Sequence, residues 1–438
     1  MLPPGTVPPS LLLVLAVFRD CFTAPSFETL AALVTGTVTR TGRRTVTGML
    51  TGAGLSARWP HDRAHRFFAA GVWDLDRVGL VLARLIVERL LPAGAALQVA
   101  VDDTLFKRTG RKVFGAAWQY DGAATGPKPI GRGTCFVVVA LVVRLPFLTR
   151  PIALPILARL WRPKQGKTKV DLALDLVALL ARAFTDRRID VVADGAYHGR
   201  ALRELPGTVT WTCRLPVNAA LYELAPPPTG RRGRPCLKGA KIGTPKSWAE
   251  QAVFTAHTVT RYNRPPATVH IAELVCLWYG SFHTRTIRVL LVRDPGSTKP
   301  FDLALVTTDL TTPAAELVER YAGRWSIETT FEEVREHLDV GQAQNRVRAA
   351  VERTVPFGLY VYSLTVIWYA LHGHHPADVA EHRARAPWYT TKTTPSFQDM
   401  VVKLRRTVIA ARNMPEHAGQ PTDHEIAAVH RAWAAAAA

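Results

Sequence analysis

The chain has 438 residues, 48% of them hydrophobic and 21% charged, so its composition is that of a folded protein with room for two or three domains. Its 55 Lys and Arg against 35 Asp and Glu give a net charge of +20, which suits a polyanionic partner, nucleic acid before an anionic membrane. The 5 cysteines are widely spaced without a CxxC pair, which favours reduced thiols in the cytoplasm over a disulfide framework or a zinc site.

Three sequence patterns argue against other classes of protein. The apolar run 11–18 has no basic residue before it, unlike a secretory signal peptide. The run 355–371 is short for a membrane span and carries Pro, Gly and 3 Tyr, so we expect a buried helix and no membrane partner. The sequence contains no GxxxxGK[ST] motif and therefore gives no indication of nucleotide hydrolysis.

Residues 1–95 are predicted to form an N-terminal helical domain, a candidate for binding DNA ends. Helical periodicity is found over 27–34, 64–72 and 78–91. Between the first two segments, Arg40, Arg43 and Arg44 precede a short candidate helix over 46–50. A helix-turn-helix that reads DNA and a plain helical connector both fit this pattern.

Residues 96–215 are predicted to form the first part of an α/β core. Runs rich in β-branched residues predict strands over 97–101, 134–143, 149–157, 189–193 and 209–215. Helical patterns over 169–184 and 199–205 lie between the later strands. The first of these strands ends at Asp102-Asp103, and the fourth ends at Asp194. Acids held at strand ends suit a metal site, because Mg²⁺ prefers carboxylate oxygens on rigid elements.

The chain changes character after residue 215. Residues 216–300 are predicted to be a β-rich insertion that begins with a basic loop. Residues 301–385 return to the core with a strand over 301–307 and a helix that starts near Pro313. Residues 386–438 form a polar C-terminal region to which we assign no function.

The most informative stretch is 321–335, YAGRWSIETTFEEVR, which we predict to be one helix. Its apolar positions form a single stripe: Ile327, Phe331, Val334 and Leu338. Beside that stripe, an arc of roughly 60° carries four functional groups: Tyr321, Arg324, Glu328 and Arg335. Guanidinium groups bind phosphate, and a carboxylate can bind a divalent cation. The alternative is a surface helix with solvated charges, which has the same periodicity.

The order Tyr, Arg, Glu and a basic residue at these spacings resembles the Y-R-E-K signature of bacterial insertion-sequence transposases of the DDE class. Arg335 stands where that family usually has Lys, and Trp325 is also similar to the family. The resemblance spans 97–375, including the order of strands, helices and aspartates. It implies an α/β, ribonuclease-H-like mixed-sheet core with a β-rich insertion and an N-terminal helical domain.

The resemblance also implies the activity. Family members cleave and join DNA strands at the ends of an insertion sequence by two-metal phosphoryl transfer, with two Mg²⁺ ions that Mn²⁺ can replace. The implied partners are transposon-end inverted repeats and target DNA, bound by a homodimer on paired ends. A catalytically inactive, transposase-derived DNA-binding regulator and a hydrolytic nuclease that never joins strands are the alternatives.

By the resemblance, the catalytic and metal-binding acids are Asp103, Asp194 and Glu328. Family members have Thr after the first Asp, which points to Asp103, and we expect Asp102 to face away if the strand continues. The segment DGAYHGR resembles the one that carries the second acid, Asp194. On physical grounds Glu332 is a rival to Glu328, because it lies one helical turn further on.

The predicted DNA contacts come from the helix, the loop after the first strand and the insertion: Tyr321, Arg324, Arg335, Lys107, Arg108 and Trp278. Arg111 and Lys112 continue the same basic loop. A solvated basic loop is the alternative for the loop residues. Trp278 is a candidate for stacking on a flipped base, and a tryptophan of the core is the alternative.

Overall fold

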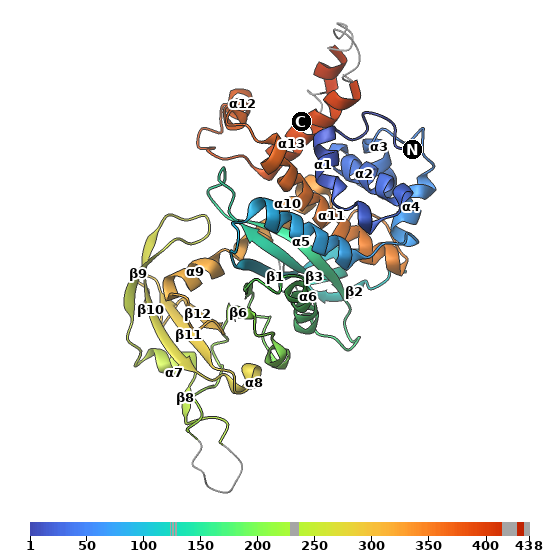
Figure 1. The fold of residues 1–438 in the computed structure, drawn as a ribbon. Helices are drawn as coiled ribbons and strands as arrows, with labels where there is room; N and C mark the ends of the chain where they lie inside the picture. Colours follow the sequence, from blue (N-terminus) through green and yellow to red (C-terminus); the bar gives the residue numbers. More distant parts are fainter. Residues whose placement is uncertain (123, 125–126, 128, 228–235, 414–426, 433–438) are drawn as a thin grey trace.

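Helices make up the N-terminal part of the protein. The computed structural model describes residues 1–438 except 123, 125–126, 128, 228–235, 414–426 and 433–438. The N-terminal helices are α1 (Pro9–Ala16), η1 (Arg19–Cys21), α2 (Ala24–Thr39), α3 (Val46–Gly52), α4 (His61–Ala69) and α5 (Leu75–Leu90). They include all the helices that periodicity predicts in this region. Figure 1 shows α1–α4 gathered at one end with α11 and α13, α5 beside the core strands, and β9–β12 at the other end.

A mixed ten-stranded sheet runs through the described residues in the order β2-β3-β1-β5-β6-β12-β11-β10-β9, with β4 also paired to β3. Its core strands are β1 (Leu97–Lys107), β2 (Ala117–Tyr120), β3 (Ile130–Val143), β4 (Ile152–Trp161), β5 (Ile189–Ala193), β6 (Val209–Arg214) and β12 (Leu303–Thr307). From the predicted insertion come β9 (Thr255–Val259), β10 (Ala267–Cys276) and β11 (Ile287–Arg293), which extend the same sheet. The core is the predicted ribonuclease-H-like α/β fold.

Smaller elements complete the middle of the chain: α6 (Lys169–Ala183), η2 (Arg200–Glu204), β7 (Leu221–Tyr222), β8 (Lys241–Gly243), α7 (Pro245–Ala249) and α8 (Tyr279–Phe282). The first of these, α6, starts at a capping box. The Thr168 side chain accepts a hydrogen bond from the Asp171 N–H (3.1 Å), and the Asp171 carboxylate accepts one from the Thr168 N–H (2.7 Å). This cap fixes the first helical residue, Lys169, beside β1.

Strand β1 is longer than predicted. The sequence indicated a strand that ends at Asp102-Asp103, but β3 pairs antiparallel with β1 residue by residue from Val99 to Lys107. The continuous ladder places both aspartates inside the strand. Because neighbouring side chains of a strand point to opposite faces, Asp102 and Asp103 face opposite sides of the sheet.

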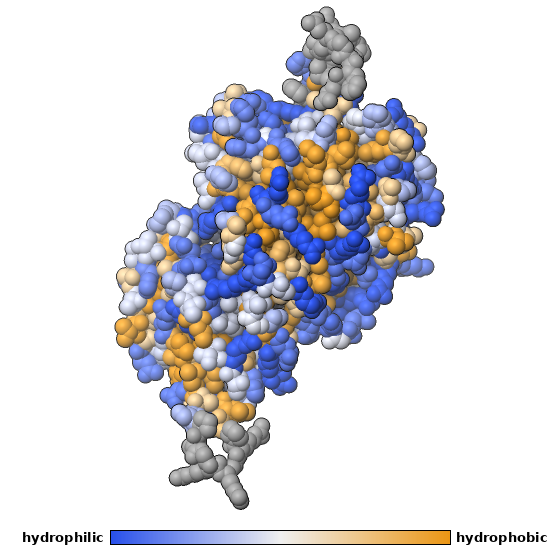
Figure 2. Space-filling view, viewed as in Figure 1, coloured by the Kyte–Doolittle hydropathy of each residue, from blue (hydrophilic) through white to orange (hydrophobic). Residues whose placement is uncertain are grey.

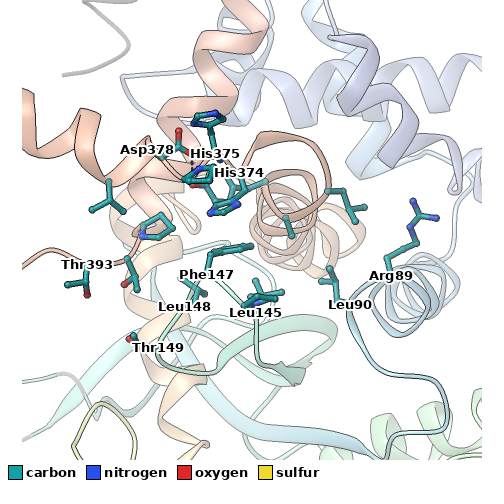
Figure 3. A pocket seen from close by; sticks show the side chains of 18 residues that line it. Arg89, Leu90, Leu145, Phe147, Leu148, Thr149, His374, His375, Asp378 and Thr393 are labelled. Atoms are coloured by element: carbon teal, nitrogen blue, oxygen red, sulfur yellow. Dashed lines mark hydrogen bonds between the residues drawn. The ribbon is translucent and has the colours of Figure 1, made fainter.

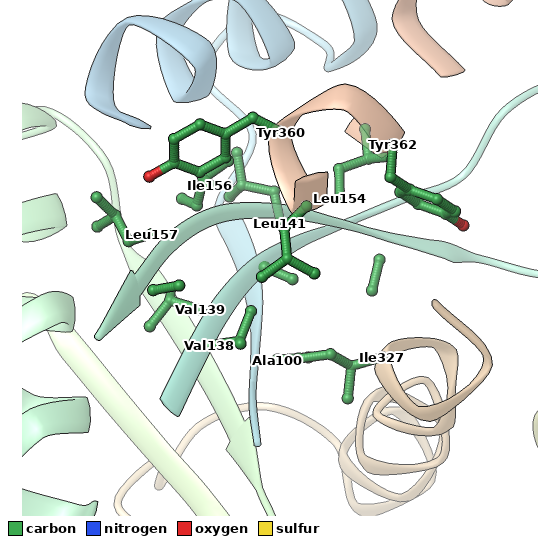
Figure 4. Close-up of a cluster of buried hydrophobic side chains, with 14 of the residues drawn as sticks. Ala100, Val138, Val139, Leu141, Leu154, Ile156, Leu157, Ile327, Tyr360 and Tyr362 are labelled. Carbon is green, nitrogen blue, oxygen red and sulfur yellow. The ribbon is translucent and has the colours of Figure 1, made fainter. Parts of the chain in front are cut away.

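Helix α10 (Trp325–Leu338) packs on one face of β1 and β4. Figure 4 shows Ile327 of this helix beside Ala100, in a cluster that includes Val138. Ile327 and Ala100 are fully buried, and the Thr330 hydroxyl donates a hydrogen bond to the Ala153 carbonyl (2.9 Å). This packing holds the next residue, Glu328, above the sheet.

The remaining helices are α9 (Ala314–Ala322), α11 (Arg348–Trp368), η3 (Tyr369–Gly373), α12 (Asp378–Arg385) and α13 (Phe397–Asn413). Among the described residues, 348–373 form the one helix that is long and apolar enough to cross a membrane, and 89% of its most apolar window is buried inside the protein. This burial agrees with the expected core helix. Figure 2 shows hydrophobic residues gathered on this face over the helical part, with hydrophilic residues along its margins.

A buried charge network ties α9 to the sheet. Asp309, 2% exposed, accepts hydrogen bonds from Arg188 (2.7 Å) and from Arg320 (3.0 Å). Arg320 also lies 3.3 Å from the Asp190 carboxylate on β5. Burial alone would raise the pKa of Asp309, but hydrogen bonds from Thr312 and the charge of Arg188 hold it well below its usual value. The network therefore fixes the helix that leads into α10.

We expect Asp309→Asn to lower the free energy of unfolding at pH 7 by about 3–5 kcal/mol, because it leaves the buried Arg320 with too little negative charge. A carboxyl with a depressed pKa stabilises the fold above its unfolded pKa of about 3.9, and that contribution is lost as the pH falls. Urea unfolding between pH 7 and pH 3 should show the difference between the two proteins shrinking below about pH 4. A constant difference would contradict the role given to the charge.

Candidate active site

The two neighbouring aspartates of β1 belong to different clusters. Arg324 Nη1 lies 3.1 Å from Asp102 Oδ2 on the face covered by α10. Lys169 Nζ lies 2.6 Å from Asp103 Oδ2 on the face covered by α6. The expected orientation is therefore reversed, because the unbroken strand turns Asp102 toward Glu328 and Asp103 away from it.

Arg324 lies between two carboxylates. Its Nη1 is 3.1 Å from Asp102 Oδ2 and 2.8 Å from Glu328 Oε1, and the residue is 5% exposed. Burial raises the pKa of Asp102, the charge of Arg324 opposes that rise, and the charges of Asp103 and Asp194 add to it, which leaves the pKa at about 7. Burial also raises the pKa of Glu328. Such shifts mark a place where negative charge is concentrated out of water, as at many functional sites.

Asp194 follows β5 directly, and β5 runs parallel to β1 with Ala193 opposite Val101. The next residue on each strand is an aspartate, so Asp194 and Asp102 stand side by side on the same face. The charge of Asp194 raises the pKa of Asp102 and that of Glu328. The structure therefore pairs Asp102 and Glu328 with one guanidinium and places Asp194 near enough for its charge to act on all three.

The helix predicted over 321–335 is divided at Gly323 and Arg324, where α9 ends and α10 begins. Both residues keep right-handed helical angles, with φ −58° and ψ −20° for Gly323 and φ −53° and ψ −35° for Arg324. Arg324 and Glu328 consequently remain one turn apart. Tyr321 is buried beside them with its ring centroid 5.8 Å from the Arg324 guanidinium, and burial raises its pKa to about 12.

The donor types of this cluster suit a divalent cation, since carboxylate oxygens are the preferred ligands of Mg²⁺ and Mn²⁺. Within the part of the chain that the structure describes, no three His, Cys, Asp or Glu residues are near enough to one another to form a metal-binding group. Arg324 Nη1 instead lies between two of these acids, 3.1 Å from Asp102 Oδ2 and 2.8 Å from Glu328 Oε1. The donor atoms are therefore of the type that binds a divalent metal, and in this structure the guanidinium of Arg324 is the cation between them.

Asp103 anchors the segment that carries Asp194. Its carboxylate accepts hydrogen bonds from the Tyr197 hydroxyl (2.9 Å), Lys169 (2.6 Å) and the Cys135 thiol (3.2 Å). Tyr197 is buried at the end of a turn in which its N–H bonds to the Asp194 carbonyl (3.0 Å). Sequence reasoning missed this cluster, although an aromatic residue three positions after Asp194 in DGAYHGR is a usable signal.

The two predicted DNA contacts from the loop after β1 lie in different environments. Arg108 is buried and donates hydrogen bonds to the carbonyls of Gly341 (2.7 Å) and Ala343, so it braces the segment after α10 and does not face solvent. Lys107 is exposed, and its ammonium lies 3.1 Å from Asp121. Of these two residues, the structure leaves Lys107 on the surface.

The other two predicted contacts also make protein contacts. Arg335 donates hydrogen bonds to the Thr104 hydroxyl and the Leu105 carbonyl of β1. Trp278 is buried, with its ring centroid 5.1 Å from that of His198. In this structure Trp278 has the environment of a core tryptophan, which is the alternative given for it, and its role in base stacking stays a prediction.

A cavity lies away from the acids beside Arg324. It measures about 830 Å³ and is lined by Phe147, Tyr369, His374 and neighbouring residues (Figure 3). The rings of Phe147 and His374 stack with centroids 4.4 Å apart, and Asp378 accepts a hydrogen bond from the Tyr369 hydroxyl (2.6 Å). Its lining includes none of the acids gathered around Arg324, so it does not belong to that cluster.

Comparison with known proteins identifies the family of the chain. A family model described as "DDE superfamily endonuclease" matches residues 17–270, which is more than half of the 438 residues. The match includes Asp102, Asp103 and Asp194 and ends before Glu328. No curated protein matches the chain. On the evidence of the family match, the chain belongs to the DDE superfamily of endonucleases.

Proposed function

We propose that this DDE endonuclease is a DNA transposase that cleaves and joins strands at the ends of an insertion sequence. The observation that supports it most directly is the pairing of Asp102 and Glu328 with Arg324, within range of the charge of Asp194. These acids come from a strand, a strand end and a helix that are far apart in the sequence. Three carboxylates on rigid elements are what metal-dependent phosphoryl transfer requires.

In this proposal Asp102, Asp194 and Glu328 replace the predicted set, with Asp102 in place of Asp103. They would hold the divalent metal, Mg²⁺ or in its place Mn²⁺, in a two-ion site. A metal bound there would supply Lewis acidity toward the phosphate and toward the attacking oxygen. Arg324 lies beside these acids, and its planar guanidinium suits two oxygens of a backbone phosphate. Tyr321 packs beside that guanidinium and restricts its position.

The proposed substrates are the terminal inverted repeats and a target DNA, bound by a homodimer that pairs the two ends. The net charge of +20 supports a polyanionic substrate. The N-terminal helices remain a candidate for reading the ends. There Arg44 serves the fold, since it is buried and donates to the Asp339 carboxylate (2.5 Å). Arg43 is exposed beside it.

The test is an assay on linear DNA that carries the inverted repeats flanking the gene, with a labelled target duplex and Mg²⁺. We expect strand breaks at the repeat ends, followed by products that join an end to the target. Binding without cleavage would identify the regulator, and cleavage without joined product would identify the hydrolytic nuclease. The Asp102→Asn protein serves as the control for a contaminating nuclease.

A further inference from the structure

Asp102 and the exposed end of the hairpin formed by β2 and β3 lie on the same face of the sheet. The strand β3 pairs with β1 on one side and with β2 on the other, and neither ladder has an irregularity. Directly paired residues point to the same face. The paired residues on this face, in order from Asp102 to the end of the hairpin, are Asp102↔Val138, Thr104↔Phe136, Phe106↔Thr134, Trp118↔Arg132 and Tyr120↔Ile130. Trp118 and Tyr120 therefore share a face with Asp102.

Aromatic rings on this hairpin are open to solvent. Trp118 is 69% exposed and Tyr120 is 71% exposed, two residues apart on the edge strand β2. Ile130, opposite Tyr120, is 55% exposed. Between the rings, Gln119 points to the other face and donates to the Gly133 carbonyl (3.1 Å), which keeps the strand in register. Two adjacent rings held on a paired strand make a rigid surface suited to flat ligands.

The segment that leads from β1 into this hairpin is basic. Residues 104–122 contain four Lys or Arg and one acid, Asp121, which is buried beside Lys107. Arg132 donates to the carbonyls of Arg108 (3.1 Å) and Gly110 (2.9 Å) and thereby braces the turn that exposes Arg111 and Lys112. Exposed cations next to exposed rings are the combination that binds nucleic acid strands.

We propose that Trp118 and Tyr120 form a stacking platform for unpaired bases of the DNA strand that leads into the acidic cluster. The proposal rests on the proposed function. Arg132, which pairs with Trp118, lies six positions from Val138 on β3, so the Trp118 ring lies ~20 Å along the sheet from Asp102, and Tyr120 lies two positions further on. That distance corresponds to about six nucleotides of one strand. The platform would hold the strand after it separates from its partner near the scissile phosphate.

Charge favours DNA over a second copy of the chain as the occupant. Two copies that met through this hairpin would bring like charges together, with Arg111 and Lys112 exposed on each. A DNA strand offers phosphates to these side chains and base faces to the rings. Paired bases have no free face within a duplex, so the platform should distinguish unpaired from paired DNA.

The test compares two DNA probes with equal numbers of phosphates: a duplex with an eight-nucleotide single-stranded tail, and a fully paired duplex. Affinity is measured by fluorescence anisotropy in EDTA, so a protein that never cleaves still gives an answer. For Trp118→Ala/Tyr120→Ala we expect about 10–100-fold weaker binding of the tailed probe, from ring stacking on each base. Binding of the paired duplex should stay within about twofold.

Two further variants keep the result interpretable. Trp118→Phe/Tyr120→Phe retains rings and should restore most of the affinity for the tailed probe. Trp388→Ala removes another exposed tryptophan, 71% exposed and outside the sheet, and should change neither probe. Equal losses for both probes, or no loss for the tailed one, would overturn the proposal. So would a change in oligomeric mass in sedimentation with DNA affinity intact, which would indicate that a second copy occupies the platform.

Discussion

Asp102→Asn is expected to slow DNA cleavage at least about 100-fold and to leave DNA affinity within about twofold. The amide keeps the shape of the side chain and loses the anionic oxygen that a divalent cation prefers. Its partner Arg324 keeps Glu328 at 2.8 Å, so the helix junction should hold its position. Single-turnover cleavage in Mg²⁺ and anisotropy in EDTA measure the two quantities separately.

Asp103→Asn is the matched control, since it is the same change one residue away on the opposite face of β1. Here the loss falls on the pair with Lys169 and the bond from Tyr197. We expect the free energy of unfolding to fall by about 1–3 kcal/mol, while cleavage stays within about tenfold of wild type. An inactive Asp103→Asn protein beside an active Asp102→Asn protein would show that the acid of the site faces α6, contrary to the structure.

The sequence predicted the elements of the fold better than their orientations. Apolar β-branched runs such as 134–143 and 189–193 mark buried strands whatever their neighbours are, and β3 and β5 form there. The face of Asp102 depends on how far β1 continues, which is decided by pairing with β3. A motif comparison based on the Thr after Asp103 does not contain that information.

Whether a basic or aromatic residue is buried or exposed could not be inferred from its neighbours in the sequence. Arg108 and Lys107 are neighbours in a basic run, yet one is buried under the segment after α10 and the other is exposed. The difference arises because Arg108 reaches carbonyls at Gly341, more than two hundred residues away. Trp278 and Trp118 likewise differ in burial, because other segments pack against Trp278 and leave Trp118 exposed. Contacts between distant segments decide each case, and local sequence does not record them.

Glu328→Gln and Glu332→Gln make a second matched pair, because both acids lie on α10 one turn apart and sequence spacing alone leaves both open. Glu328 Oε1 lies 2.8 Å from Arg324 Nη1, and burial raises the pKa of this carboxyl. Glu332 is exposed and acts on Glu328 only through its charge. The structure thus directs one acid to the cluster and the other to solvent.

We expect Glu328→Gln to slow cleavage at least about 100-fold and Glu332→Gln to slow it less than about threefold. Titration of each protein with Mn²⁺ in the absence of DNA gives a readout independent of activity. Glu328→Gln should bind Mn²⁺ at least about tenfold more weakly, since it loses one of three carboxylates, whereas Glu332→Gln should bind it as wild type does. The reverse result would move the third acid one helical turn toward the C-terminus, out of reach of Arg324, and would separate the ion-paired cluster from the metal site.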